Sequence, residues 1–308
     1  MRIVFMGTPE FAIPILERLH EQEEVVLVVT QQDARKGRGK KLHPSPIKKK
    51  ALELGLEVFT PEDVNSLSSY ERLQKAQGDL FVVAAYGQIL TKGILDLPSR
   101  YSINVHGSLL PHYRGAAPIE RAILAGEETT GITIMKMAEG LDAGDMALKK
   151  EIAIDEKNAG QLRTELSEIG GELLMEFIEL MKNDQESFTA QNEKEATYAE
   201  KITKTDFPLL FEKENTKELV NHIRALSPDY GARINYKGKM LKIFDGKGLC
   251  ENSQKEPGTI IRSKNQLIIK TLDGALEVLE IQAPGKRKMK IKDFLLGNQL
   301  QENTKIGD

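Results

Sequence analysis

An asparagine and a histidine, two residues apart, stand at the end of a buried stretch of this chain. Asn104 and His106 lie in a strand predicted over residues 101–106, which ends at Gly107. Because successive side chains point to opposite faces of a strand, these two point to the same face. An amide supplies a neutral hydrogen-bond donor, and an imidazole can donate or carry a proton at neutral pH. The pair therefore suits a carbonyl oxygen that becomes an oxyanion during a reaction.

The residues after this strand favour catalysis over the simpler alternative, a polar pair that only closes a turn. Residues 108–111 read Ser-Leu-Leu-Pro, a short apolar bend whose backbone amides are free to bind a ligand. Residues 112–117 form a loop, and Pro118 stands where a helix can start. A polar loop of this length behind a buried strand is usually functional.

A second loop brings a carboxylate that could serve the same site. Asp142 is bracketed by Gly140 and Gly144, so the backbone there can place it tightly. If Asp142 faces His106, it orients the imidazole and favours its charged form. An aspartate next to a glycine is also common turn chemistry, and Asp145 fits that alternative.

Alternating strands and helices must position these residues. Buried strands are predicted over residues 2–6, 25–30 and 80–85, and a helix is predicted from Pro9 to about His20. Strand, turn, helix and strand form the βαβ unit of a parallel sheet, which binds ligands at the carboxyl ends of its strands. The first turn, Gly-Thr-Pro-Glu, lacks the glycine spacing of a dinucleotide site or a phosphate-binding loop. Further strands are predicted over 56–59, 132–137 and 146–154, and helices over 118–124 and 158–181.

The strand over 80–85 runs into residues 86–90, Tyr-Gly-Gln-Ile-Leu. Backbone groups near Gly87 either bind a flat heterocycle by its edge or make an ordinary turn from strand to helix. The residues alone favour neither alternative.

A basic segment interrupts an acidic first half. Residues 1–206 hold 25 Lys and Arg against 33 Asp and Glu, whereas residues 207–308 hold 18 against 13. Between Gln31 and Lys50, eight of twenty residues are basic and one is acidic. A solvated loop is the simpler interpretation, but this segment follows a strand at the predicted ligand edge, where a phosphate backbone would need it. The basic second part likewise favours a polyanionic partner.

Length and composition set the broad class. A chain of 308 residues with 40% hydrophobic and 29% charged residues is typical of a soluble protein with two domains. The single cysteine, Cys250, excludes an internal disulfide and a cysteine zinc cluster. The N-terminus reads as a strand rather than a signal peptide, and no apolar run reaches membrane-spanning length. We therefore expect a cytoplasmic protein with no membrane partner and no metal.

The order of the elements predicts two domains. The α/β pattern continues through residue 189, and a polar, weakly periodic linker is predicted over 190–206. Residues 207–308 contain a helix over 216–226 and then short strands separated by glycine-containing turns, which is typical of a small β-barrel.

The motifs together resemble those of the folate-dependent formyltransferases. The resemblance includes N-x-H-x-S-L-L-P at 104–111, P-x-Y-R-G-A-A-P at 111–118 and G-L-D-A-G-D at 140–145. It covers nearly the whole chain, and the basic residues at 37–41 and 285–289 are similar to those of the members that act on a tRNA. Phe207 stands where the family commonly has tryptophan.

The resemblance implies a fold, substrates and a set of site residues. The fold would be α/β, with a Rossmann-like formyltransferase domain and a C-terminal OB-like β-barrel domain. The donor would be 10-formyltetrahydrofolate and the acceptor initiator methionyl-tRNA, used by a cytoplasmic monomer. The catalytic residues would be Asn104, His106 and Asp142. The folate-binding residues would be Ser108, Leu109, Leu110, Pro111, Tyr86, Gly87, Gln88, Ile89 and Leu90. The tRNA-binding residues would be Lys36, Arg38, Lys40, Lys41, Lys286, Arg287 and Lys288, with Arg38 reading the acceptor end.

Three alternatives stay open from the sequence. A formyltransferase acting on a small amine, such as a purine precursor or an amino sugar, shares the chemistry without needing the basic loop or the barrel. A formyltetrahydrofolate hydrolase uses water as acceptor. A tRNA-binding module with an inactive cleft would need only the basic residues. The presence of Asn104, His106 and Asp142 argues against this alternative.

Overall fold

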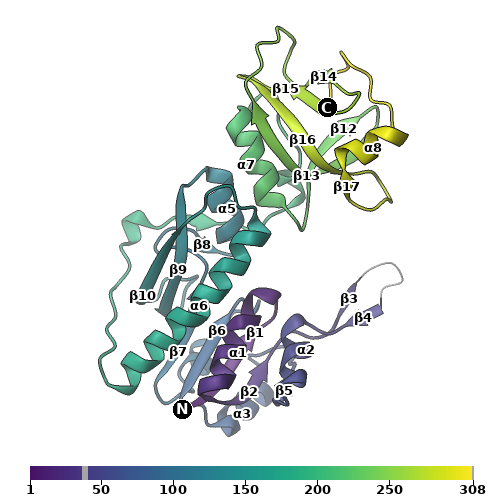
Figure 1. Cartoon of the computed structure of the whole chain (residues 1–308). Coiled ribbons are helices and arrows are strands. Elements are labelled where there is room, and N and C mark those ends of the chain that lie inside the picture. The colour runs from purple at the N-terminus through teal and green to yellow at the C-terminus, as the bar shows by residue number, and fades with distance from the viewer. Residues whose placement is uncertain (37–40, 307–308) are drawn as a thin grey trace. The chain divides into compact units, whose positions relative to one another are not determined.

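The computed structural model describes residues 1–36 and 41–306, and its internal contacts divide the chain into two compact units. The first unit comprises residues 1–118, 129–153 and 163–199. The second comprises residues 119–128, 154–162 and 200–308. Figure 1 shows a twisted sheet with helices in the first unit and a curled sheet in the second.

A seven-stranded sheet forms the frame of the first unit, in the order β10-β9-β7-β6-β1-β2-β5. The five strands from β7 to β5 are parallel, whereas β9 is antiparallel to both of its neighbours. After β1, the chain adds β2 and then β5 on one side of β1, and it then crosses to form β6 on the opposite side of β1. This topological switch confirms the predicted Rossmann-like α/β fold. The strands are β1 (Arg2–Gly7), β2 (Glu24–Val29), β5 (Val58–Phe59), β6 (Leu80–Ala84), β7 (Tyr101–His106), β9 (Thr129–Lys136) and β10 (Met146–Ala153).

Helices α1 and α6 lie on one face of this sheet (Figure 1). A methyl group built on Gly170 of α6 would lie 2.9 Å from Val105 of β7 and 3.6 Å from Ile15 of α1. The glycine therefore lets α6 approach the strand that carries Asn104 and His106. The helices up to this point are α1 (Ile13–Gln22), α2 (Pro46–Glu53), α3 (Leu67–Ala76), α4 (Lys92–Leu95), α5 (Pro118–Ala125) and α6 (Ala159–Lys182), of which α5 from residue 119 and α6 up to residue 162 belong to the second unit.

The first helix begins later than the sequence predicted. Residues Glu10–Ala12 form a 3-10 turn, and α1 starts at Ile13 with Pro14 in its first turn. The N–H groups of a first turn have no partner within the helix, so Pro14 removes no helical bond. The predicted bend at Pro14 was therefore wrong, because the proline stands at the start of the helix.

Two short strand pairs complete the first unit. Strands β3 (Ala34–Lys36) and β4 (Lys41–His43) form an antiparallel ribbon, and α2 follows it. Strands β8 (Arg114–Gly115) and β11 (Tyr198–Ala199) pair in parallel, so a segment after α6 returns to the loop after β7.

The second unit is built on an antiparallel sheet in the order β12-β13-β16-β15-β14, with β17 also paired to β16. Its curl is consistent with the predicted β-barrel (Figure 1). Helix α7 begins with a capping box between Asn215 and Glu218, and its buried Leu219 and Ile223 join the core. The elements are α7 (Thr216–Leu226), β12 (Ala232–Tyr236), β13 (Lys239–Leu249), β14 (Ile260–Arg262), β15 (Leu267–Lys270), β16 (Ala275–Gln282), β17 (Met289–Lys290) and α8 (Ile291–Gly297).

A buried ion pair anchors α7 within the second unit. The Nδ1 atom of His222 lies 2.7 Å from Oε1 of Glu214, and Nε2 lies 2.6 Å from the backbone oxygen of Asp206. Burial alone lowers the pKa of His222, but its bonds to Glu214 and Asp206 outweigh burial, so the pKa lies above the ordinary 6.5. Burial raises the pKa of Glu214, yet His222 and the Leu210 amide hold it below the ordinary 4.5.

The stability of the second unit should depend on both charges of this pair. The raised pKa of His222 gives stability that is complete below the unfolded pKa and is lost as pH rises through the folded pKa. The lowered pKa of Glu214 gives stability that is lost as pH falls through it. We expect Glu214→Gln to cost about 1.5–3 kcal/mol near neutral pH. Urea unfolding at a series of pH values should show that the loss of unfolding free energy in Glu214→Gln becomes smaller at both low and high pH. A loss that does not change with pH would contradict the ion pair.

Within the described ranges, no helix is both long and apolar enough to cross a membrane.

Candidate active site

The three predicted catalytic side chains come together in the first unit. The Nδ2 atom of Asn104 donates to Oδ1 of Asp142 at 3.3 Å, and Nδ1 of His106 lies 3.7 Å from Oδ2 of the same carboxylate. Asn104 and His106 are 9% and 5% exposed, so both are largely shielded from bulk water. The strand β7 positions the first two, and the loop between β9 and β10 brings the carboxylate back over them.

The imidazole of His106 is oriented by the backbone rather than by a short bond to Asp142. Its Nε2 lies 3.0 Å from the carbonyl oxygen of Tyr113. A carbonyl can only accept, so Nε2 carries the hydrogen and Nδ1 faces the carboxylate. Ser108 supports the same turn, since its hydroxyl donates to the carbonyl oxygen of His112 at 2.6 Å.

The Asp142 carboxylate is held mainly by a backbone amide. The N–H of Gly115 donates to Oδ2 of Asp142 at 2.9 Å. Gly115 has φ of +123°, and a Cβ there would lie 2.7 Å from the carbonyl oxygen of Ala199. Asp142 itself has φ of +49°, in the left-handed region. Gly144 passes so close to the backbone of Lys136 that no side chain would fit.

The predicted folate-binding residues follow two neighbouring parallel strands. Residues 108–111 follow β7, and residues 86–90 follow β6, so both segments lie at the carboxyl edge of the sheet. Thr133 fixes the first segment, because its hydroxyl donates to the Ser108 carbonyl at 2.7 Å and accepts from the Leu110 amide at 3.1 Å. No local sequence pattern pointed to Thr133, because its role depends on the pairing of β9 with β7.

The segment 86–90 is braced by side chains from elsewhere in the unit. The carbonyl oxygen of Tyr86 accepts from the Thr8 hydroxyl at 2.7 Å, and the amide of Gln88 bonds to the backbone of residues 62 and 64. Burial, with the nearby Asp63, raises the pKa of Tyr86 to about 12. Ile89 is 84% exposed, so its side chain is free to contact a ligand.

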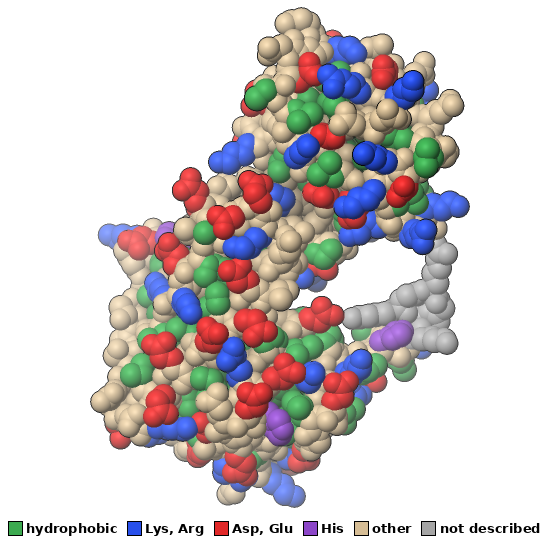
Figure 2. Space-filling view, viewed as in Figure 1, with side chains coloured by type: hydrophobic (Ala, Val, Ile, Leu, Met, Phe, Trp, Pro, Cys, Tyr) green, Lys and Arg blue, Asp and Glu red, His purple; other side chains and the backbone are tan. Residues whose placement is uncertain are grey.

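The predicted tRNA-binding residues divide into three groups. Arg38 and Lys40 lie outside the described residues, and the backbones of Lys36 and Lys41 are register partners in β3 and β4. In the second unit, Lys286 and Arg287 are exposed. Lys288 differs, since it pairs with Glu280 at 2.8 Å and lies over the Phe244 ring. Lys and Arg side chains gather on the visible face of the second unit, whereas acidic side chains are frequent on the first (Figure 2).

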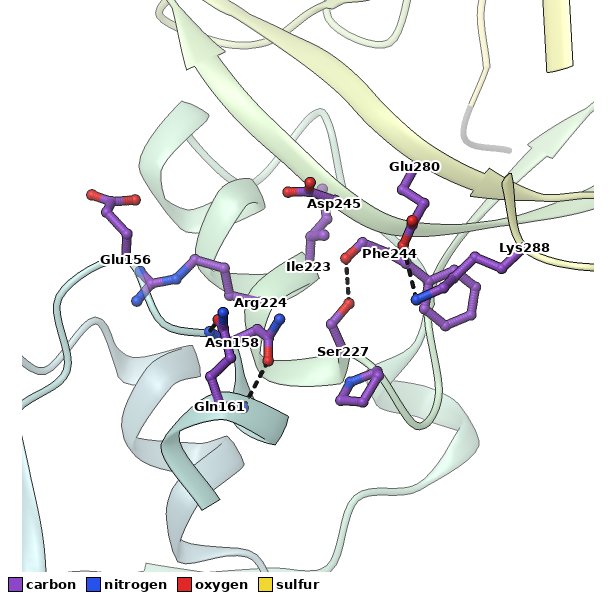
Figure 3. Close-up of a pocket in the computed structure, with 11 residues that line it drawn as sticks. Glu156, Asn158, Gln161, Ile223, Arg224, Ser227, Phe244, Asp245, Glu280 and Lys288 are labelled. Atoms are coloured by element: carbon purple, nitrogen blue, oxygen red, sulfur yellow. Dashed lines mark hydrogen bonds and ion pairs between the residues drawn. The ribbon is translucent and has the colours of Figure 1, made fainter. Parts of the chain in front are cut away.

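A cavity of about 290 Å³ lies in the second unit, away from every predicted site residue except Lys288 (Figure 3). Arg224 extends into its wall toward Glu156, but its guanidinium already donates to the carbonyl oxygens of Lys157, at 3.0 Å, and of Asp155. The two cations of this lining, Arg224 and Lys288, thus already have acceptors within the second unit. Among residues 1–36 and 41–306, no cluster of His, Cys, Asp and Glu side chains could hold a metal ion.

The fold and these side chains are consistent with the predicted formyltransferase, and comparison with known families shows this class of protein. A family model described as formyl transferase matches residues 1–178, and one described as formyl transferase, C-terminal domain, matches residues 201–299. Because the first covers more than half of the chain, the chain belongs to the formyltransferase family.

Within that family, the chain is similar over its full length to methionyl-tRNA formyltransferases. The protein of that name from Caldanaerobacter subterraneus subsp. tengcongensis is 46% identical over 307 residues, with 99% of both chains covered. That from Clostridioides difficile is 41% identical over 310 residues, with 100% of both covered. Among solved structures, the sugar 3N-formyltransferase WlaRD has a TM-score of 0.67 at 20% identity, covering 93% of this chain and 99% of its own. HypX from Aquifex aeolicus, solved with tetrahydrofolic acid, has a TM-score of 0.66 at 17% identity, covering 99% of this chain and 50% of its own. These two likenesses concern the fold.

Proposed function

We propose that this chain transfers a formyl group from 10-formyltetrahydrofolate to the α-amino group of methionyl-initiator tRNA, which yields N-formylmethionyl-tRNA for translation initiation. The observation that carries the proposal is the convergence of Asn104, His106 and Asp142 on one point, in a chain that matches methionyl-tRNA formyltransferases from end to end. It acts as a cytoplasmic monomer, with catalysis in the first unit, to which residues 190–199 of the predicted linker belong, and with tRNA contacts in 207–308.

The reaction joins the methionyl nitrogen to the formyl carbon and breaks the bond from that carbon to N10 of the folate. A free α-amino group has a pKa of about 7.7–8.0, so much of it is already nucleophilic at neutral pH. Attack converts the formyl oxygen into an oxyanion. The Asn104 amide has one N–H directed at Asp142 and a second one available for that oxygen, and Nδ1 of His106, the ring nitrogen away from the Tyr113 carbonyl, is a second donor when it carries a proton.

Asp142 completes the proton balance of the reaction. The attacking nitrogen must lose a proton, and N10 must gain one before tetrahydrofolate leaves. Asp142 lies within 3.7 Å of His106 and can accept the first proton, directly or through water, and return it to N10. The segments 86–90 and 108–111 bind the folate at the carboxyl edge of the sheet.

One assay tests this function against its alternatives. The protein would be incubated with 10-formyltetrahydrofolate and charged initiator methionyl-tRNA, and the tRNA would be analysed for formylmethionine. Formylation of the charged tRNA, with none of free methionine, supports the proposal. Turnover of the folate without an acceptor would identify a hydrolase. Transfer only to a small amine would identify the other class of transferase. The absence of any reaction in all samples would contradict the proposed function.

The exposed basic residues of the second unit should govern the salt dependence of tRNA use. We expect Lys286→Ala with Arg287→Ala to lower the slope of log(kcat/KM) against log[salt] by about 2 in magnitude, because each phosphate contact contributes about 1. Lys288→Ala is the matched control, since its ammonium is already paired with Glu280 and should change the slope less. Kinetics across a salt series would measure all three slopes, with KM for the folate unchanged. An unaltered slope in the double variant would remove these residues from the tRNA surface.

A further inference from the structure

The loop that carries Asp142 is clasped by a side chain from a distant segment. The Nε2 atom of Gln191 donates to the carbonyl oxygens of Asp142 and Gly144, each at 2.7 Å. These two carbonyls lie on either side of Ala143, directly after the left-handed residue Asp142. One amide group therefore bonds to two backbone oxygens of the segment that follows the turn.

The opposite end of the same amide is fixed by a buried arginine. The Oε1 atom of Gln191 accepts from Nε of Arg114 at 3.0 Å. Because Arg114 only donates and the two carbonyls only accept, the orientation of the amide has one solution. Arg114 is 2% exposed, and its other nitrogens bond to both carboxylate oxygens of Glu193 at 2.8 and 3.0 Å.

Arg114 itself belongs to the loop that supports the catalytic residues. It lies between Tyr113, whose carbonyl orients His106, and Gly115, whose amide holds Asp142. The segment containing Gln191 and Glu193 is tied to this loop along its length. The amide of Tyr113 donates to the Thr197 hydroxyl at 2.9 Å, and that of Arg114 donates to the Thr197 carbonyl at 2.8 Å.

We propose that Gln191 is a positioning residue for the formyl-transfer reaction: it fixes the Asp142 loop against the Arg114 loop so that the carboxylate stays in place beside Asn104 and His106. This inference rests on the proposed function and adds a residue that touches neither substrate. Gln191 falls in the segment predicted from sequence to begin the linker, although residues 163–199 pack within the first unit.

The hydrogen bonds of Gln191 to Asp142, Gly144 and Arg114, which we call the Gln191 clasp, need both the NH₂ donor and the oxygen acceptor of an amide. Leucine fills similar space but offers no donor to the carbonyls and no acceptor to Arg114. Glutamate keeps the acceptor for Arg114, but when ionised it turns a second oxygen toward two carbonyl oxygens. When protonated, glutamate regains one donor, so Gln191→Glu should recover as pH falls.

Two variants with matched controls would test the clasp. Gln191→Leu and Gln191→Glu would be compared with Gln74→Leu and Gln74→Glu, which alter an exposed glutamine on α3 of the same unit. We expect Gln191→Leu to lower kcat by about 10- to 100-fold through misplacement of Asp142. KM for methionyl-tRNA should change less than about twofold, because no substrate contact is lost. The controls should match the wild type.

The pH profile separates positioning from general damage. As pH falls, the ratio of the kcat of Gln191→Glu to that of the wild type should rise by about tenfold per pH unit, over the range in which the new carboxyl becomes protonated. The corresponding ratio for Gln191→Leu should stay flat. A wild-type kcat in Gln191→Leu, or a flat ratio in Gln191→Glu, would overturn the proposal.

Amide hydrogen exchange gives a readout that needs no enzyme activity. Peptides covering residues 140–146 should exchange faster in Gln191→Leu than in wild type, while peptides around Gln74 stay unchanged. If the wild type formylates no tRNA, the proposed function fails and this measurement still decides the clasp. If exchange at 140–146 is identical in both proteins, the clasp is wrong whatever the enzyme transfers.

Discussion

Alanine in place of Asn104 or His106 is expected to lower kcat on the order of 10²–10³-fold, the usual effect of losing one oxyanion donor. Asn104 directs only one of its two N–H bonds at Asp142, which leaves the other for the developing charge. His106 is held by the Tyr113 carbonyl at 3.0 Å, so its ring is already in place before substrate arrives. A preoriented donor needs no rearrangement as charge develops, and so it acts mainly on kcat.

Single-turnover formylation of methionyl-tRNA would measure these effects without interference from product release. Asn183→Ala and His20→Ala are matched controls, because the side-chain amide of Asn183, just after α6, donates among the described residues only to Glu179, and His20 is exposed on α1. Near-wild-type kcat in either site variant would exclude that residue from oxyanion binding.

The substitution Asp142→Asn should lower kcat on the order of 10³-fold, within the range for loss of a proton-transfer group. Three groups face this carboxylate: the Asn104 amide, the Gly115 N–H and Nδ1 of His106. Asparagine keeps one acceptor oxygen and presents an NH₂ group where a second acceptor is needed. It also removes the negative charge beside Nδ1 of His106 and the group that returns a proton to N10.

The same loop supplies the control for this prediction. Asp145→Asn makes the same chemical change at an exposed position three residues away, and it should leave kcat close to wild type. Both variants would be assayed by single turnover together with folate binding. Loss of folate binding in Asp142→Asn, with the chemical step intact, would assign Asp142 to the folate site instead.

The arrangement of elements follows closely from local sequence patterns. The strand over 101–106 and the helix over 216–226 have the predicted bounds, because each is an uninterrupted periodic run with a clear stop. The N-terminal helix begins later than predicted. Pro9 and Pro14 both suit the first turn of a helix, and in the structure the α-helix begins beside Pro14. The predicted strand over 132–137 is longer in the structure, beginning at Thr129, because pairing with β10 extends it.

The sequence by itself determined which groups we expect to do chemistry. Strand alternation placed Asn104 and His106 on one face, and glycines around Asp142 marked a tight loop. These inferences need only neighbouring residues, whose relation is set by backbone geometry.

The tertiary structure decided how those groups are held. The partner of His106 is a backbone carbonyl seven residues later, and Asp142 stays 3.7 Å away from the ring. The residue that fixes the Asp142 loop, Gln191, lies 49 residues further along the chain. Its segment reaches that loop because Thr189 pairs with Met146 at the start of β10 and β11 pairs with β8. Local sequence patterns do not encode contacts between segments so far apart, because those contacts depend on the path of the whole chain.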